Sequence, residues 1–314
     1  MSRLNDGAAR PRWSVMIPSY NCADLLRVAL TSVLDQDPGP EIMQIEVIDD
    51  CSNNDRPEDV VREVGGERVV FTRQPHNVGI AANLTSCLTR SRGEWVHVLH
   101  GDDVAYDGLY ARVGKLLAGH ADVGAVVVGA EDIDEQGAVI KANVPLRPSR
   151  QILDDFEQGI FSWNPVRAPS VLARRSTYED IGGFHPDLRY CADWDMWKRM
   201  AAGTCLLYEP DVLVGYRVHH SSDTAKLGTS VLQLREMIQA LRIAHRYLPD
   251  GRTRAWSRGF YATTRLWALD MLRSPTRPLS AKDRAGYAGV IAESTLRSLA
   301  DRVMYRNAHR REPS

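Results

Sequence analysis

The chain has 314 residues, of which 44% are hydrophobic and 25% are charged, a balance typical of globular proteins with a sizeable core. This composition argues against a disordered, fibrous or membrane-spanning protein, because the strongest apolar run, residues 123–130, is far shorter than the roughly 20 residues that a bilayer requires. The formal net charge of −1 predicts no nucleic-acid partner.

The charge is unevenly distributed along the chain. Residues 226–314 contain 17 Lys and Arg against 7 Asp and Glu, whereas residues 1–225 contain 22 against 33. We therefore expect a polar N-terminal segment over 1–12, a main domain over 13–225 and a separate basic region from residue 226 onward.

The cysteines and the N-terminus indicate the compartment. There are five cysteines, an odd number, and none form a Cys-x-x-Cys pair, which favours free thiols in a reducing environment. Residues 1–12 are polar and lack the apolar stretch of a signal peptide. These features predict a cytoplasmic protein.

The first hundred residues alternate between predicted strands and helices. Apolar runs predict four strands, and helical spacing predicts three helices, the first with Asn21 as its N-cap. The strands are expected over 13–17, 43–48, 68–72 and 95–99, and the helices over 22–35, 60–64 and 79–90. The alternation predicts an α/β fold with a mostly parallel, helix-covered sheet, in which ligands bind beyond the carboxyl ends of the strands.

The second half is less regular. We expect a strand over 125–128 and a hairpin or lid within 131–165. A helix over 190–201 would point Trp194 and Trp197 inward. Two short strands are then expected over 206–208 and 213–218, followed from about residue 230 by helices that break at 249–251 and 275–278.

Polar clusters follow three of the predicted strands. They are Pro18-Ser-Tyr-Asn21, Asp49-Asp50 and His100-Gly-Asp-Asp103. Carboxylates in such places can hold a hard divalent cation that binds phosphate oxygens, although a solvated turn would give a lone Gly-Asp-Asp the same appearance. The sequence has neither of the common glycine-rich phosphate loops, so a nucleotide would be held by acids and a metal.

Two further candidates lie in the second half. Asp193 or Asp195 could act as a general base, although acids in the first turn of a helix are also favoured by the helix dipole. His219 could complete a metal shell, although a His pair such as His219-His220 is often structural.

Seven segments, in their order along the chain, resemble glycosyltransferase family 2. They are IPSYN, VIDDCSNND, QPHNVGIAANLT, GEWVHVLHGDD, SVLARRSTYEDIGGFHPDL, CADWDMWKRMA and YRVHHSS. The resemblance covers roughly residues 13–222. It implies an inverting enzyme with a GT-A fold that uses a nucleotide-sugar donor, with a nucleotide-binding half over 13–105, an acceptor and catalytic half over 106–225, and a basic helical extension over 226–314.

The resemblance also implies a set of donor-binding residues. They are Pro18, Ser19, Tyr20, Asn21, Asp49, Asp50, Asn77, Gly79, Asn83, His100, Asp102 and Asp103. His100 stands where the family usually has the first aspartate of its Asp-x-Asp-Asp motif, although an imidazole can still hydrogen-bond a ribose hydroxyl. Mn²⁺ or Mg²⁺ is expected on Asp102 and His219.

The family's catalytic base corresponds to Asp193, with Asp195 as the alternative. Ala192 replaces the glutamate that usually precedes the base. In the implied mechanism, Asp193 accepts the proton of an acceptor hydroxyl that attacks the anomeric carbon, and configuration inverts as the nucleoside diphosphate leaves. The acceptor wall is assigned to Trp163, Trp194 and Trp197, with core packing as the alternative for Trp194 and Trp197.

The resemblance leaves the substrates open. UDP-, dTDP- and GDP-sugars are possible donors, and a glycan, a lipid-linked molecule or a small molecule is a possible acceptor. The basic region either packs on the acidic domain and builds a dimer or an acceptor wall, or contacts anionic lipid peripherally. Two other classes compete: a non-catalytic nucleotide-sugar-binding protein, which would transfer nothing, and a metal-dependent phosphohydrolase, which would release sugar phosphate.

Overall fold

The structure is a computed structural model that describes residues 10–154, 159–161, 163–220, 222, 230–247, 251–274 and 279–309, without the side chains of 251–256 and 301–309. The chain forms two compact units. The first comprises Met1–Asp154, Pro165–Arg189 and Gly203–His219, and the second Asp155–Asn164, Tyr190–Ala202 and His220–Ser314. None of the described helices combines the length and the apolar composition that a membrane span needs.

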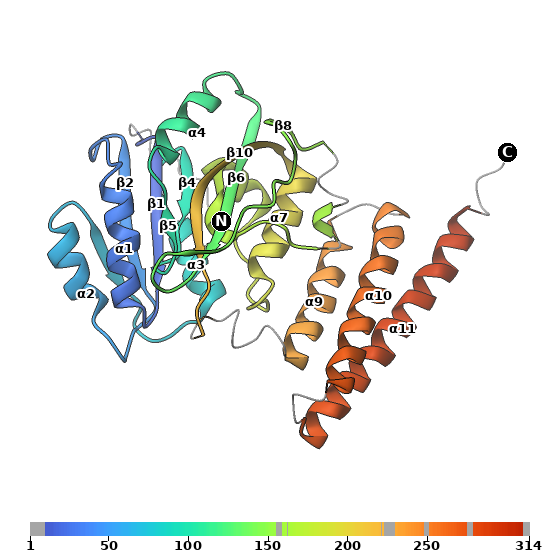
Figure 1. The fold of residues 1–314 in the computed structure, drawn as a ribbon. Coiled ribbons are helices and arrows are strands. Elements are labelled where there is room, and N and C mark those ends of the chain that lie inside the picture. The colour runs from blue at the N-terminus through green and yellow to red at the C-terminus, as the bar shows by residue number, and fades with distance from the viewer. Residues whose placement is uncertain are drawn as a thin grey trace. The chain divides into compact units, whose positions relative to one another are not determined.

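The first unit is built on a single mixed sheet (Figure 1). Its strands are β1 (Trp13–Ser19), β2 (Met43–Asp49), β3 (Val70–Arg73), β4 (Trp95–Val98), β5 (Val104–Ala105), β6 (Val123–Ile133), β7 (Val139–Lys141), β8 (Gln151–Ile152), β9 (Val171–Arg174) and β10 (Cys205–Arg217). The order across the sheet is β3-β2-β1-β4-β9-β6-β10-β5, with β7 beside β6 and β8 beside β10.

The sheet is mostly parallel, as the sequence predicts. The pairs β2–β3, β1–β2, β1–β4 and β6–β10 are parallel. Strand β9 is antiparallel to both of its neighbours, β4 and β6, so those two strands also run in the same direction. The six strands β1, β2, β3, β4, β6 and β10 therefore end at one edge of the sheet, and β9 begins there.

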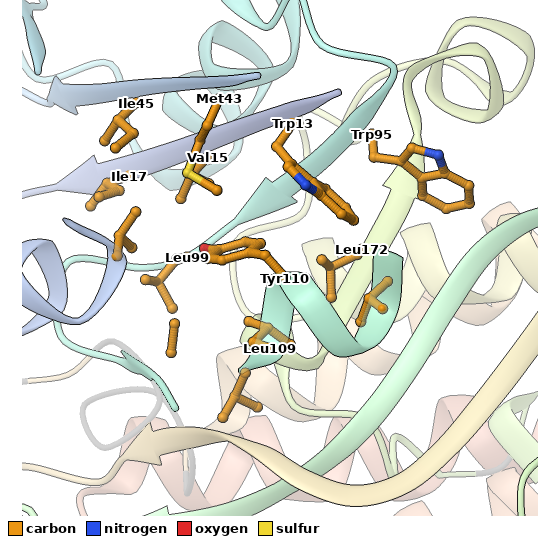
Figure 2. Close-up of a cluster of buried hydrophobic side chains, with 14 of the residues drawn as sticks. Trp13, Val15, Ile17, Met43, Ile45, Trp95, Leu99, Leu109, Tyr110 and Leu172 are labelled. Carbon is orange, nitrogen blue, oxygen red and sulfur yellow. The ribbon is translucent and has the colours of Figure 1, made fainter. Parts of the chain in front are cut away.

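Helices accompany these strands along the chain. They are α1 (Ala23–Leu34), α2 (Pro57–Val60), the π-helical turn η1 (Val61–Gly65), α3 (Ile80–Arg90), α4 (Leu109–Leu117), the 3₁₀ turn η2 (Ala168–Ser170) and α6 (Arg175–Ile181). Successive strand residues point to opposite faces, and the alternating residues Val15 and Ile17 join the core that α1 and α4 cover. Figure 2 shows Trp13, Val15 and Leu99 close to Tyr110 and Leu109 of α4 in that core.

Strand β10 differs from the prediction. Two short strands were expected, but Cys205–Arg217 forms one strand that pairs with β6 through register shifts between Glu209 and Val214. Pro210 has no N–H to donate, so the ladder is interrupted there without ending the strand. Opposite the interruption, the backbone comes so close to Gly129 that a Cβ there would lie 2.6 Å from the Pro210 carbonyl oxygen.

The second unit contains α7 (Ala192–Gly203, of which residues 192–202 belong to this unit), α9 (Val231–Ala244), α10 (Gly251–Arg273) and α11 (Ala281–His309). Helices α9, α10 and α11 lie side by side and contact one another (Figure 1). Their cores include Ile238, Leu241 and Phe260, all nearly inaccessible to solvent. The helical pattern expected from residue 230 is confirmed. The breaks expected at 249–251 and 275–278 lie outside the described residues, except for Gly251, which begins α10.

Candidate functional site

The ends of β1, β2 and β4 are fastened to one another by backbone hydrogen bonds. Asp50 N donates to the carbonyl oxygen of Ser19 at 2.8 Å, and Gly101 N donates to that of Pro18 at 2.9 Å. The three polar clusters that follow these strands therefore meet at one edge of the sheet, as their positions in the sequence predict.

The loop after β1 is held by its neighbour after β2. Asn21 has φ +50° and accepts hydrogen bonds from the backbone of Asn53 and Asn54 at 2.9 and 3.0 Å. The prediction that Asn21 is the N-cap of α1 is wrong, because Cys22 occupies that position and the N–H of Ala23 is satisfied by Asp55. Tyr20 is 44% exposed, while the preceding Ser19 is buried.

Asp49 and Asp50 are both buried, and their carboxylates accept hydrogen bonds that fix the backbone of nearby loops. Asp49 accepts hydrogen bonds from the N–H and the hydroxyl of Ser52, the latter at 2.5 Å. Asp50 receives the N–H groups of Val78 and Gly79, at 2.7 and 3.0 Å. Burial raises the pKa of Asp50, although these two N–H groups stabilise its charged form.

The segment before α3 is fixed through these contacts. The side chain of Asn77 donates to the Asp50 carbonyl oxygen at 3.3 Å, and Gly79 adopts φ +84°, which favours glycine. Asn83 is buried and donates to the Ile48 carbonyl oxygen at 3.0 Å, so it ties α3 to the end of β2. The structure thus brings Asn77 and Gly79 beside Asp50, whereas Asn83 lies in the packing between helix and sheet.

A cluster of acids and imidazoles follows β4. One ligand atom from each of His100, Asp102 and Asp103 lies within 4.8 Å of the others. From the end of β10, His219 places Nε2 2.9 Å from Oδ2 of Asp102. Asp102 is one-quarter exposed, whereas Asp103 and His219 are nearly inaccessible.

Arg217 holds the backbone around this cluster. Its N–H donates to Oδ1 of Asp103 at 2.9 Å, and its guanidinium donates to the carbonyl oxygens of Asp102, Asp134 and Glu135. Sequence patterns gave no sign of this role, because the guanidinium contacts the backbone carbonyl oxygens of residues more than 80 positions away.

The two aspartates of the cluster have opposite pKa shifts. Burial and the neighbouring Asp102 carboxylate raise the pKa of Asp103 well above its ordinary value. Burial by itself also raises the pKa of Asp102, but the hydrogen bond from His219 and the charge of the imidazoles hold that pKa below its ordinary value. Burial lowers the pKa of His100, which favours the neutral imidazole that binds metals.

These residues fit a divalent cation. The buried Oδ2 of Asp103 has no hydrogen-bonding partner among the described residues, as a metal ligand would. The 2.9 Å between His219 Nε2 and Asp102 Oδ2 also matches adjacent ligands of one octahedral ion, which lie about 3 Å apart when each bond is about 2.1 Å. Carboxylate and imidazole donors suit both Mg²⁺ and Mn²⁺.

Asp193 and Asp195 lie on α7, in the second unit, in different surroundings. Asp193 is half-buried and accepts a hydrogen bond from the side chain of Asn164 at 3.1 Å. Asp195 is inaccessible to solvent and pairs with Arg199 at 2.7 Å, with a further hydrogen bond from the Tyr247 hydroxyl. Of the two, Asp193 is the carboxylate that solvent can reach.

The three tryptophans expected at the acceptor also differ. Trp194 and Trp197 are both buried, and Trp194 packs against Phe260 with ring centroids 5.7 Å apart. Their burial favours the core-packing alternative. Trp163 is 57% exposed and contacts Trp267 edge to face.

Comparison with known proteins gives a consistent result. Residues 14–170, half of the chain, match the family described as Glycosyl transferase family 2. An uncharacterized glycosyltransferase of Rickettsia typhi is 27% identical over 233 residues, which is 72% of this chain and 69% of the relative. An uncharacterized protein of Mycobacterium tuberculosis is also 27% identical, over 70% of this chain and 71% of its own length.

Solved structures share the fold. A TarS fragment from S. aureus in complex with UDP-GlcNAc superposes with a TM-score of 0.68 at 14% identity, covering 91% of this chain and 81% of that one. The mannosyltransferase PcManGT from Pyrobaculum calidifontis, in complex with GDP-Man and Mn²⁺, gives 0.57 at 20% identity, covering 94% and 87%. The mixed sheet with flanking helices is therefore that of GT-A glycosyltransferases, and the similarity extends into the C-terminal helical region. The chain belongs to glycosyl transferase family 2 and is a glycosyltransferase.

Proposed function

We propose that the protein is an inverting glycosyltransferase that moves a sugar from a nucleoside-diphosphate donor to an acceptor hydroxyl. The observation that carries this proposal is the meeting of the His100, Asp102, Asp103 and His219 side chains with the loops after β1 and β2 at one edge of the sheet. The similar structures that hold UDP-GlcNAc and GDP-Man support a nucleotide-sugar donor.

In this proposal the nucleoside lies on the loops that end β1 and β2, and the diphosphate lies at Asp102. Asp102 and His219, with His100 and Asp103 beside them, would hold Mn²⁺ or Mg²⁺. When bound, the cation would offset the negative charge that grows on the leaving diphosphate. The Mn²⁺ in the PcManGT complex supports this choice of metal.

Asp193 is proposed as the general base that accepts the proton of the acceptor hydroxyl. Its support is chemical: Asp193 is a half-buried carboxylate that solvent can reach and that accepts from the Asn164 side chain and the Trp194 backbone N–H, whereas Asp195 is inaccessible and paired with Arg199. Attack on the anomeric carbon from the side opposite the diphosphate then inverts its configuration. Ala192, at the position where the family resemblance implies a glutamate, adds no second carboxylate.

We further propose that residues 13–225 form the transferase domain and that residues 226–314 form a distinct basic helical region. Its excess of Lys and Arg supports peripheral contact with anionic lipid or a lipid-linked acceptor. Sedimentation with anionic vesicles at low and high salt tests the contact. Binding that is absent at low salt would contradict it.

The proposed activity is tested with a panel of UDP-, dTDP- and GDP-sugars, with and without Mn²⁺. The true donor is expected to raise the melting temperature, because a ligand at 100 times its Kd stabilises a protein by about 2.7 kcal/mol. Incubation with candidate acceptors should then release nucleoside diphosphate and give a product of inverted anomeric configuration by NMR. Release of sugar phosphate would favour a phosphohydrolase, and binding without any transfer would favour a non-catalytic relative.

A further inference from the structure

An oriented arginine lies at the same edge of the sheet, and no motif of the sequence points to it. Arg167 donates from Nε and Nη2 to the two carboxylate oxygens of Asp132, at 2.8 and 2.6 Å. Its guanidinium also lies over the ring of Tyr216, 4.8 Å from the centroid. Because Asp132 and Tyr216 are paired across β6 and β10, the guanidinium is held by two side chains from adjacent strands.

One side of this guanidinium is open. Within the described part of the chain, Nη1 of Arg167 has no hydrogen-bonding partner, and the side chain is 36% exposed. Two N–H groups on a guanidinium of fixed orientation therefore remain without a partner among the described residues. A bidentate, stacked arginine loses little further freedom when it binds a ligand, so such a group is already organised for recognition.

The topology places Arg167 at the same edge of the sheet as the His100, Asp102 and Asp103 cluster. It directly precedes η2 and β9, and β9 begins at the edge where β4, β6 and β10 end. The guanidinium is near enough to Asp103 to stabilise its ionised form. In the order β2-β1-β4-β9-β6, the strands flanking Arg167 lie on the opposite side of β4 from the loops proposed to hold the nucleoside.

The chemistry favours a neutral polyhydroxyl group over a phosphate. Asp132 neutralises the positive charge of Arg167, and it would repel a second anion. A sugar hydroxyl, in contrast, can accept from Nη1 and donate to a free lone pair of the Asp132 carboxylate. If the nucleoside of the donor lies at the ends of β1 and β2 and its diphosphate at the end of β4, the sugar would lie next along the sheet, toward Arg167 and Asp132.

We propose that Arg167, oriented by Asp132 and Tyr216, binds the hydroxyl groups of the transferred sugar and so contributes to the choice of donor. This inference rests on the proposed function. It adds a donor-sugar contact to the nucleotide and metal contacts given above.

The test compares the affinity of the protein for the donor with its affinity for the nucleoside diphosphate part of that donor. The donor is the nucleotide sugar that stabilises the wild-type protein most in the panel, and affinities are measured by calorimetry with Mn²⁺. Arg167→Lys keeps the charge and removes the planar fork. We expect donor affinity to fall about tenfold while nucleoside diphosphate affinity stays within about twofold, because the lost contacts are made only to the sugar.

Arg174→Lys is the matched control. Arg174 is the last residue of β9, the strand that follows Arg167 and η2. It also pairs with a carboxylate (Glu94) and lies over an aromatic ring (Trp95), but at the opposite edge of the sheet. It should leave both affinities unchanged. Deoxy forms of the donor sugar sharpen the test: the donor that lacks the contacted hydroxyl should bind the wild type and Arg167→Lys with equal affinity.

Three results would overturn the inference. An equal loss for donor and nucleoside diphosphate would place Arg167 on the phosphates. If Arg167→Lys binds the donor and the nucleoside diphosphate as the wild type does but melts at a lower temperature, Arg167 has a structural role only. If no nucleotide sugar binds the wild-type protein, the proposed function fails and this inference fails with it.

Discussion

His219 Nε2 lies 2.9 Å from Asp102 Oδ2, although the two residues are 117 positions apart in the sequence. The contact joins the end of β10 to the loop after β4, and those strands are separated in the sheet by β9 and β6. An imidazole and a carboxylate in this relation either share a proton or bind one cation together. The first prediction distinguishes the two states.

Asp102→Asn should weaken Mn²⁺ binding by at least about tenfold, because the amide keeps the size of the carboxylate but removes its charge. The measurement is Mn²⁺ titration followed by EPR. Asp211→Asn is the control, since Asp211 is an exposed acid paired with Arg112. Equal Mn²⁺ affinity in Asp102→Asn and wild-type protein would show that the His219–Asp102 contact is only a hydrogen bond.

Asp193→Asn should lower kcat by about 10²–10⁴-fold with donor affinity nearly unchanged, because a general base acts on the acceptor. Single-turnover kinetics with prebound donor and calorimetry of donor binding provide the two readouts. Asp195→Asn should act differently: it leaves Arg199 without its buried partner, so the melting temperature should fall by several degrees. Loss of donor binding in Asp193→Asn with normal turnover of bound donor would contradict its assignment as the base.

Lys198 should make stability depend on pH above neutrality. Its ammonium is buried against the rings of Trp194 and Phe161 and has no hydrogen-bonding partner among the described residues, and burial lowers its pKa to about 8. Between pH 8 and about 10.5 the unfolded chain holds this proton and the folded chain does not, so stability rises with pH across that window. Below pH 8 both states are charged, and the cost of burial is fully present.

Lys198→Met removes that cost. We expect the variant to be more stable than the wild type by about 1–3 kcal/mol at pH 7, with the difference shrinking as the pH approaches 10. Urea unfolding at a series of pH values measures it. A constant difference from pH 7 to pH 10 would mean that Lys198 does not lose its proton on folding.

Gly129→Ala should destabilise the first unit. The added Cβ would lie 2.6 Å from the carbonyl oxygen of Pro210 and 2.7 Å from that of Asp211, so the backbone of β10 must move. We expect a cost of about 1–3 kcal/mol in thermal unfolding. Gly119→Ala is the matched control, because its nearest contact would be at 4.0 Å, and an equal loss there would contradict the steric explanation.

Sequence patterns predicted β1, β2 and β4 well because all three are buried strands rich in apolar residues: β1 and β4 are mostly apolar, and β2 alternates apolar with polar residues before ending in Val47 and Ile48. They failed at β10, where Pro210 interrupts the pattern but not the strand. Strand β9 was not predicted either, since four residues that run directly into α6 carry no turn signal to bound them.

The residues of the candidate site were likewise predictable only in part. The aspartates after β2 and β4 could be found because parallel strands bring the residues that follow them to one edge. Arg167 and Asp132 could not, because 35 positions separate them and neither belongs to a recognisable pattern. Only the antiparallel insertion of β9 between β4 and β6 brings Arg167 to that edge.

The backbone hydrogen bonds that join the ends of β1, β2 and β4 have a thermodynamic consequence. Asp50 N to Ser19 O and Gly101 N to Pro18 O link the loops proposed for the nucleoside to the loop that carries Asp102. Ordering of one loop therefore lessens the entropy lost when the next is ordered. Nucleotide and cation should bind cooperatively, and by thermodynamic reciprocity each should increase the affinity of the other by the same factor.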